Sequence, residues 1–457
     1  MDFLSIARFA QAHRDDDPVR LLLNRHRYPE VEMALVAQQL EGLATAPDKW
    51  PTLAACPDVV YPPRLNREQS SSEATARYKA SLVDPALGPA ADLTGGMGID
   101  TLFIAQRVPL MHYCEQDPDL CQLAAHNFAV LRQENISIHE GDSIQWLRQQ
   151  PDGALGTLIV DPARRDSHGG RVAAFEDCTP DILPLLPLFR SRARRVIIKA
   201  SPMLDIHTAL RQLGAVSEVH IVAVGGECKE LLFLLGDAPT EIVCTDMVRD
   251  NHQNSFPTGF AHSSPPHSGL DPESQRSRIK CGMRGREMPV AFRAESCAKQ
   301  RGGGVCPSIF NFQLSEEQSA SCPLAERVMR YLYEPNASLM KGGCYRLLGQ
   351  RFGLSLLDRN THLYTSDRLV ADFPGRIFEV EQEIHPSPKA AKAFFPDGKA
   401  HVVCRNYPLR ADLLQQQLHL KEGGDRFLIA TTHAGHRTAF VCRPADKQSS
   451  PNPTETS

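Results

Sequence analysis

Glycines and carboxylates occur together in residues 92–100, where a short apolar segment passes through a turn into a helical pattern. Gly96 and Gly98 let the backbone of such a turn approach a ligand where any Cβ would collide. Asp92 ends the apolar segment, and its carboxylate suits the cationic end of a sulfonium compound better than a diphosphate. The turn therefore predicts a cofactor site.

Two more carboxylates follow the next two strand-like segments. Glu115 lies about 20 residues after Asp92, where an acid accepts both hydroxyl hydrogens of a ribose. Asp142 follows the third segment, where a carboxylate can meet an adenine edge. Ligands of open α/β sheets bind at the carboxyl ends of strands, so we expect these groups to line one pocket. Thr101 replaces the third glycine of a dinucleotide fingerprint, which favours S-adenosylmethionine over a nicotinamide cofactor.

The fourth strand-like segment ends in Asp161, Pro162, Ala163 and Arg164. Proline fixes the backbone, so that a carboxylate and a carbonyl can both face a substrate nitrogen. Asp161 is expected to hold or deprotonate an acceptor, and Arg164 to neutralise a phosphate or carboxylate on it. These residues, with Pro162, are the predicted catalytic residues; an ordinary strand-ending turn is the alternative.

Alternating strand and helix patterns must position these groups. Apolar strand-like segments recur among helical patterns over residues 88–249, which is typical of a parallel sheet covered on both faces. We expect a doubly wound α/β domain there. Residues 1–87 are predicted to be a helical region, in which Ser70 and Glu73 have the spacing of a capping box.

The second half of the sequence divides into three zones. Residues 250–324 are rich in serine, proline and glycine and carry a basic stretch, which predicts a linker. Residues 325–443 predict a small α+β domain, and residues 444–457 a disordered tail. Within the α+β domain we expect helices over 325–333, 338–350 and 411–420, strands over 377–380 and 401–404, and a hairpin of 427–431 with 438–442.

Composition narrows the class of protein. The chain has 457 residues, 42% apolar and 23% charged, as is usual for globular proteins. It shows no signal-peptide pattern and no apolar segment near the ~20 residues of a membrane span, which predicts a cytoplasmic protein without membrane contact. The thirteen cysteines form no Cys-x-x-Cys pair, which predicts neither a disulfide framework nor a metal site. No feature indicates an oligomeric state.

The sequence resembles class I S-adenosylmethionine-dependent methyltransferases, and more closely a bacterial group whose methyltransferase domain carries a C-terminal THUMP-like domain. The resemblance covers most of the chain outside the predicted linker. The segments that carry it are residues 61–63, 71–79, 92–100, 115–117, 161–165, 226–231, 333–336, 405–408 and 423–425.

This resemblance implies a Rossmann-like methyltransferase fold that uses S-adenosylmethionine. It implies Asp92, Gly96 and Gly98 around the methionine part of the cofactor, Glu115 on the ribose, and Asp142 near the adenine. The segment at the end of the fourth strand is similar to the Asp/Asn-Pro-Pro-aromatic segment of amine methyltransferases. Here an alanine and an arginine replace the second proline and the aromatic ring, so no stacking platform for a base is supplied there.

THUMP domains accompany RNA-modifying enzymes, so the resemblance implies tRNA or rRNA as the acceptor. An excess of basic over acidic residues in 276–443 is compatible with a polyanionic partner, as it is with solvated surface charge. The candidate RNA contacts are Arg405, Arg410, Lys421 and Arg426. Two alternatives are methylation of a protein or small-molecule amine or carboxylate, and a non-catalytic RNA-binding protein that kept the fold.

Overall fold

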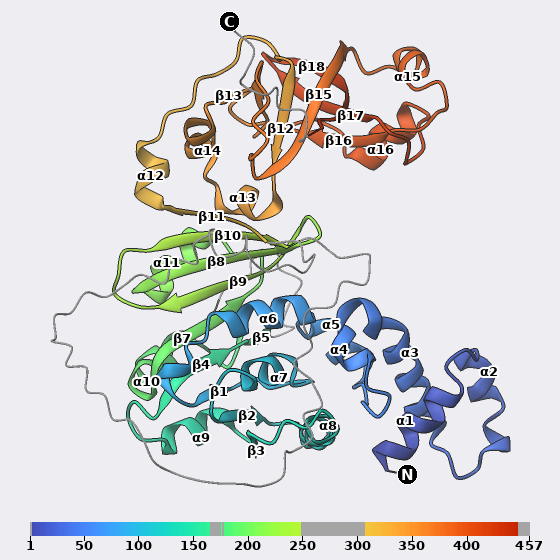
Figure 1. Cartoon of the computed structure of the whole chain (residues 1–457), viewed down its shortest axis with the longest axis vertical. Coiled ribbons are helices and arrows are strands. Elements are labelled where there is room, and N and C mark those ends of the chain that lie inside the picture. Colours follow the sequence, from blue (N-terminus) through green and yellow to red (C-terminus); the bar gives the residue numbers. More distant parts are fainter. Residues whose placement is uncertain (1, 165–174, 176–177, 248–306, 447–457) are drawn as a thin grey trace, which may run out of the picture. The chain divides into compact units, whose positions relative to one another are not determined.

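The computed structural model describes residues 2–164, 175, 178–247 and 307–446 (Figure 1). Apart from residues 248–307, the chain forms one compact unit. Predictions for residues 250–306 and most of the tail thus lie outside the described residues. Of the helices that are described, none is long and apolar enough to cross a membrane.

Six α-helices precede the first strand. They are α1 (Phe3–Ala12), α2 (Pro18–Leu23), α3 (Met33–Lys49), α4 (Pro51–Ala54), α5 (Arg64–Gln69) and α6 (Glu73–Ser81). Helix α6 begins one residue after Ser72, whose hydroxyl accepts a hydrogen bond from the backbone N–H of Thr75. The predicted capping box at Ser70 and Glu73 is therefore wrong, because Glu73 lies at the first helical position and accepts from Thr52 instead.

A nine-stranded sheet forms the centre of the chain, in the order β11-β10-β8-β9-β7-β4-β1-β2-β3. Its strands are β1 (Ala90–Asp92), β2 (Met111–Glu115), β3 (Ile136–Glu140), β4 (Leu155–Val160), β7 (Ala193–Ala200), β8 (Val216–Val224), β9 (Glu227–Leu235), β10 (Glu241–Met247) and β11 (Ser308–Gln313). Strands β3, β2, β1, β4 and β7 are parallel, as predicted. Strand β9 runs antiparallel to β7 and β8, because Gly225 and Gly226, both with positive φ, turn the chain directly back.

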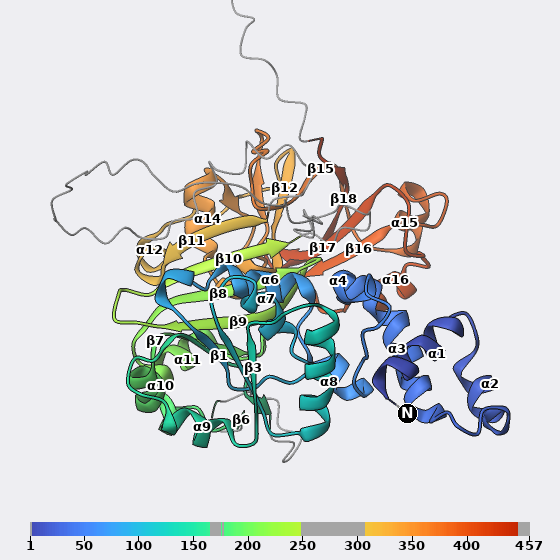
Figure 2. The same ribbon diagram turned by 60° about the horizontal axis from the view of Figure 1, so that its bottom comes forward.

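Helices cover both faces of this sheet (Figures 1 and 2). Strand β4 is buried throughout, and its alternate side chains belong to different cores: Leu158 and Val160 to one, Ile159 to the other. The first core includes residues of α9 (Ser143–Gln149), α10 (Leu186–Arg192) and α11 (Ile206–Leu213). The second includes residues of α6, α7 (Ile99–Ala105) and α8 (Pro118–Val130). The doubly wound Rossmann-like α/β fold is confirmed.

A seven-stranded sheet follows, in the order β13-β14-β12-β15-β18-β17-β16. It contains β12 (Tyr331–Pro335), β13 (Ser355–Leu356), β14 (Tyr364–Ser366), β15 (Gly375–Ile384), β16 (His401–Arg405), β17 (Phe427–His433) and β18 (His436–Pro444), with α13 (Ala337–Gly342), α14 (Tyr345–Phe352), α15 (Pro388–Phe394) and α16 (Ala411–Gln417). The predicted hairpin of β17 and β18 is confirmed. The helix predicted over 325–333 is wrong because β12 occupies 331–335, and the helix over 338–350 is divided at Gly343.

The predicted linker extends too far toward the C-terminus. Strand β11 pairs antiparallel with β10, and buried Phe310 and Phe312 alternate with exposed side chains along it. Helix α12 (Leu314–Ser319) then follows within the range that had been predicted as linker. A domain boundary at residue 249 would thus separate β11 from the sheet in which it pairs.

Candidate functional site

A pocket of about 1300 Å³ lies at the carboxyl ends of the parallel strands. It is lined by the turn between β1 and α7, by residues that follow β2, β3, β4 and β7, and by residues 66 and 69–71 of the N-terminal region. This volume exceeds that of a typical single-ligand site, so a cofactor and an acceptor group have room together. Asp92, Gly96, Gly98, Glu115, Asp142, Asp161 and Pro162 all line it, so the structure brings these predicted residues together.

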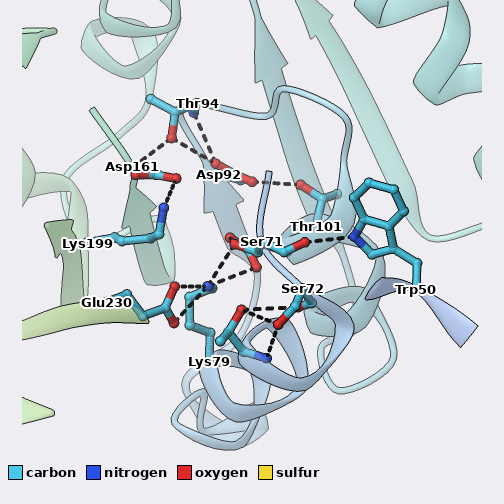
Figure 3. A network of polar contacts seen from close by, with 12 residues as sticks. Trp50, Ser71, Ser72, Lys79, Asp92, Thr94, Thr101, Asp161, Lys199 and Glu230 are labelled. Atoms are coloured by element: carbon cyan, nitrogen blue, oxygen red, sulfur yellow. Dashed lines mark hydrogen bonds and ion pairs between the residues drawn. The ribbon is translucent and has the colours of Figure 1, made fainter. Parts of the chain in front are cut away.

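Asp92 organises the base of the pocket (Figure 3). Its Oδ1 accepts from the backbone N–H of Thr94 at 3.0 Å, and its Oδ2 accepts from the hydroxyl of Thr101 at 2.9 Å. The Thr94 hydroxyl in turn accepts from the backbone N–H of Asp161 at 2.7 Å. Thr94 therefore ties the end of β1 to the end of β4, and Thr101, at the place of the missing glycine, anchors the Asp92 carboxylate.

The glycines of the turn meet two different requirements. Gly96 and Gly98 have φ of 52° and 81°, a region that side-chain-bearing residues rarely adopt. A Cβ on Gly98 would lie 2.7 Å from the Phe128 ring, whereas a Cβ on Gly96 would meet only the Thr94 carbonyl oxygen, at 3.8 Å. Gly98 thus fits the packing of α8, while Gly96 leaves open space on its pocket side.

Glu115 holds the turn from the neighbouring strand. Its Oε2 accepts from the backbone N–H of Gly96 at 2.8 Å, and its Oε1 accepts from the N–H groups of Gln116 and Asp117. A carboxylate has about four acceptor positions, so hydroxyl groups of a ligand can still donate to it. Asp142 caps α9 by accepting from Ile144 and Gln145, and its exposed side chain lies at the pocket.

Asp161 follows β4 and forms an ion pair with Lys199, whose Nζ lies 2.5 Å from its Oδ2. Both side chains line the pocket. Ala163 and Arg164 form the short strand β5, paired with β6 (Cys178–Thr179). The side chain of Arg164 lies outside the described part of the chain, so its predicted role stays a prediction.

Lysines and acids behind the pocket form a network that sequence reasoning missed (Figure 3). Lys79, on α6, is fully buried; its Nζ lies 2.9 Å from Glu230 on β9, 3.2 Å from Asp100 on α7 and 3.0 Å from the Ser71 hydroxyl. Burial lowers the pKa of Lys79, but the two carboxylates outweigh it and raise that pKa overall. A lysine at helical spacing from Thr75 and Ala76, on the buried face of α6, was the available signal. The Lys199–Asp161 pair was missed because the two residues lie at the ends of different strands, 38 positions apart.

The residues just before helix α6 contact both the domain and the pocket. The Trp50 indole donates to the Ser71 carbonyl at 2.8 Å, and the Ser71 hydroxyl donates to Asp100 at 2.9 Å. Ser71 also lines the pocket. The segment before α6 is thus packed into the domain and forms part of the pocket wall.

The electrostatics of Asp92 give a testable pH dependence. Burial, and secondarily the charge of Asp100, raise the pKa of Asp92 to about 7. The folded protein holds the Asp92 proton more tightly than the unfolded chain does. The protonated carboxyl therefore stabilises the fold below pH 4, and this contribution is lost as the pH rises to about 7. Asp92→Asn should therefore unfold at higher urea than the wild type at pH 7.5, by up to about 4 kcal/mol, with little difference near pH 4.

Urea unfolding of the cofactor-free protein at several pH values checks this, with exposed Asp152→Asn as the control. Parallel curves for wild type and Asp92→Asn across the pH range would show that Asp92 is ionised in the fold.

Among the residues that the structure describes, no group of three or more His, Cys, Asp or Glu side chains is arranged to hold a metal ion.

Residues 331–374 match a ferredoxin-like domain family, and residues 375–444 match a THUMP domain-like family. The predicted THUMP-like domain over 325–443 is therefore corrected to its second part, because the first part matches a different family.

Whole-length relatives were also found. The crystal structure of a "putative methyltransferase" from Porphyromonas gingivalis W83 is 30% identical, with a TM-score of 0.75, and the match covers 97% of this chain and 98% of that one. Proteins of two Mycobacterium tuberculosis strains, each described as an uncharacterized S-adenosylmethionine-dependent methyltransferase, are 22% identical over 85% of this chain and 92% of theirs.

Proposed function

This chain belongs to the class I S-adenosylmethionine-dependent methyltransferases that carry a THUMP-like domain, and from this premise we propose that its acceptor is RNA. The observation that carries the proposal is that residues 375–444 match a THUMP domain-like family. The pocket also has room for an acceptor beside the cofactor. A cytoplasmic location, which the sequence predicts, is part of the same proposal.

We assign the cofactor to the carboxylate-lined part of the pocket. Asp92, Gly96 and Gly98 would surround its methionine part, Glu115 would accept from its ribose, and Asp142 would lie near its adenine. The fit rests on charge, because acidic side chains suit a sulfonium cation, and on Gly96, where a side chain would take up pocket space. When bound, the cofactor supplies an electrophilic methyl carbon.

The chain's own residues then position the acceptor. Asp161 would accept the acceptor's proton, Pro162 would hold the backbone after β4 in an extended path, and Arg164 would neutralise a phosphate of the RNA. Methyl transfer is an in-line displacement, so orientation of acceptor and donor supplies most of the acceleration.

The four candidate RNA contacts differ in exposure and in whether an acidic side chain already neutralises their positive charge. Arg405 pairs with buried Glu334, and Arg426 pairs with Glu381. Arg410 is 83% exposed and pairs with Asp412, which is itself exposed, and Lys421 is exposed. Arg410 and Lys421 are therefore the better candidates for phosphate contacts, while Arg405 also holds the second sheet together.

The experiment is to incubate the protein with methyl-labelled S-adenosylmethionine and separate pools of tRNA, rRNA and protein from a strain that lacks the gene. We expect label in an RNA pool, and RNA binding that weakens steeply with added salt, because phosphate contacts release counterions. Label confined to the protein pool would support the alternative acceptor. A chain that binds RNA without transferring label would support the non-catalytic alternative.

A further inference from the structure

Two lysine–carboxylate pairs lie next to each other near the pocket, where β4 and β7 end and the antiparallel β9 begins (Figure 3). In the first, Lys199 and Asp161 are 17% and 32% exposed and both line the pocket. In the second, Lys79 and Glu230 are at most 3% exposed and lie behind the first pair. The pocket-facing pair is therefore available to a substrate, and the second pair is not.

Lys199 carries a positive charge in this arrangement. Burial lowers the pKa of its ammonium group, but Asp161 and then Glu230 outweigh burial and raise that pKa well above its ordinary value. Lys79 satisfies Glu230 with hydrogen bonds of 2.9 and 3.0 Å, so Asp161 is the carboxylate with which Lys199 makes its hydrogen bond. A substrate group that reaches Asp161 thus also meets the ammonium of Lys199.

An ammonium group at this place distinguishes between acceptor atoms. When an amine nitrogen takes up a methyl group, the nitrogen becomes more positive, and a neighbouring ammonium raises the energy of that transition state. When a hydroxyl oxygen reacts, it becomes more negative as its proton leaves, and the same ammonium stabilises it. Lys199 therefore favours an oxygen acceptor over a nitrogen acceptor.

We infer that the acceptor atom is a hydroxyl oxygen, namely a ribose 2′-hydroxyl, and that Lys199 and Asp161 act on it together. The inference rests on the proposed RNA acceptor and deepens it, because the 2′-hydroxyl is the hydroxyl that every internal RNA nucleotide carries. It also explains why the segment after Asp161 needs no aromatic ring to stack a base: the reacting group is on the sugar.

The transfer step requires only the hydroxyl group, the cofactor and the side chains of Asp161 and Lys199. The hydroxyl oxygen attacks the methyl carbon, so a C–O bond forms while the C–S bond breaks and its electron pair stays on sulfur, leaving a neutral thioether. The hydroxyl proton passes to a carboxylate oxygen of Asp161 and then to solvent. The ammonium of Lys199 donates a hydrogen bond to the oxygen as its negative charge develops.

The position of the label in the product tests the inference. The full chain is incubated with methyl-labelled S-adenosylmethionine and total RNA from a strain that lacks the gene, and the RNA is then hydrolysed with alkali. A 2′-O-methyl group prevents attack on the adjacent phosphodiester, so we expect the label in alkali-stable dinucleotides. Label in mononucleotides, as a methylated base gives, overturns the inference and leaves the proposed RNA acceptor standing. RNA without label overturns both.

Variants of Lys199 supply a second, independent readout. We expect Lys199→Met to lower the rate of transfer at least about 100-fold at saturating cofactor, and Lys199→Arg, which keeps the charge, to recover part of that loss. Exposed Arg107→Met, outside both the pocket and the THUMP-like domain, is the control for loss of a cationic side chain. A folded Lys199→Met variant that transfers methyl groups as fast as the wild type or faster would overturn the inference, since removal of the cation helps an amine acceptor. If the methionine variant unfolds, the dinucleotide assay still decides.

Discussion

Asp161→Asn is expected to lower the rate of methyl transfer by about 100- to 10,000-fold, the range over which a positioned proton acceptor contributes to catalysis. Asparagine keeps the shape of the side chain and an oxygen that can accept a hydrogen bond from Lys199. The variant therefore loses the proton acceptor without changing the shape of the pocket. The measurement is single-turnover transfer to RNA at saturating cofactor, with the cofactor dissociation constant determined on the same protein.

The control for Asp161→Asn is Asp152→Asn, which removes an acid paired with Arg192 outside the pocket. It should transfer methyl groups at the wild-type rate. The cofactor dissociation constant of Asp161→Asn should stay within about threefold of the wild type, because the assigned cofactor contacts come from β1, β2 and β3. Unchanged turnover in Asp161→Asn would remove Asp161 from catalysis.

Lys79→Met should be the most destabilising single change in this part of the chain. It leaves Glu230, which is 2% exposed, without the cation that donates hydrogen bonds to it, and removing one partner of a buried ion pair costs about 3–5 kcal/mol. Burial already raises the pKa of Glu230, so the variant should lose the most stability above neutral pH, where this carboxyl would have to ionise unpaired. Urea unfolding at pH 7.5 measures the effect.

The double variant Lys79→Met/Glu230→Gln separates loss of a charge pair from loss of packing. With no carboxylate left unpaired at position 230, it should be more stable than Lys79→Met alone. Arg64→Met, which breaks an exposed ion pair with Glu68 one helical turn away, should barely move the unfolding midpoint. If Lys79→Met unfolds at the same urea concentration as Arg64→Met, the buried network does not hold α6 to the sheet.

That the residues assigned to the cofactor lie together in one pocket could be predicted, because their positions depend on local sequence. The turn after Asp92 and the acids Glu115 and Asp142 each follow directly from a strand, and parallel strands bring their carboxyl ends to one edge. Gly96 and Gly98 were recognisable for the same reason, since their backbone conformation is required within the turn itself.

The acceptor half depends on contacts between distant residues. Lys79 and Glu230 are 151 positions apart, and Lys199 and Asp161 are 38 apart, so no periodicity in the sequence links them. Strand β11 was missed because about sixty residues separate it from its partner β10. Those residues are rich in serine, proline and glycine, so the whole range including β11 was predicted as a linker. The antiparallel direction of strand β9 depends on the Gly225–Gly226 turn, which a parallel-sheet pattern does not anticipate.

Calorimetric titration of the full chain with S-adenosylmethionine, beside Glu115→Ala, tests the central claim that this pocket holds the methyl donor. We predict binding of one cofactor per chain to the wild type and affinity at least about tenfold weaker in Glu115→Ala, because hydrogen bonds to a charged acceptor are lost. Equal affinity in the two proteins, or no heat of binding to the wild type, would contradict it.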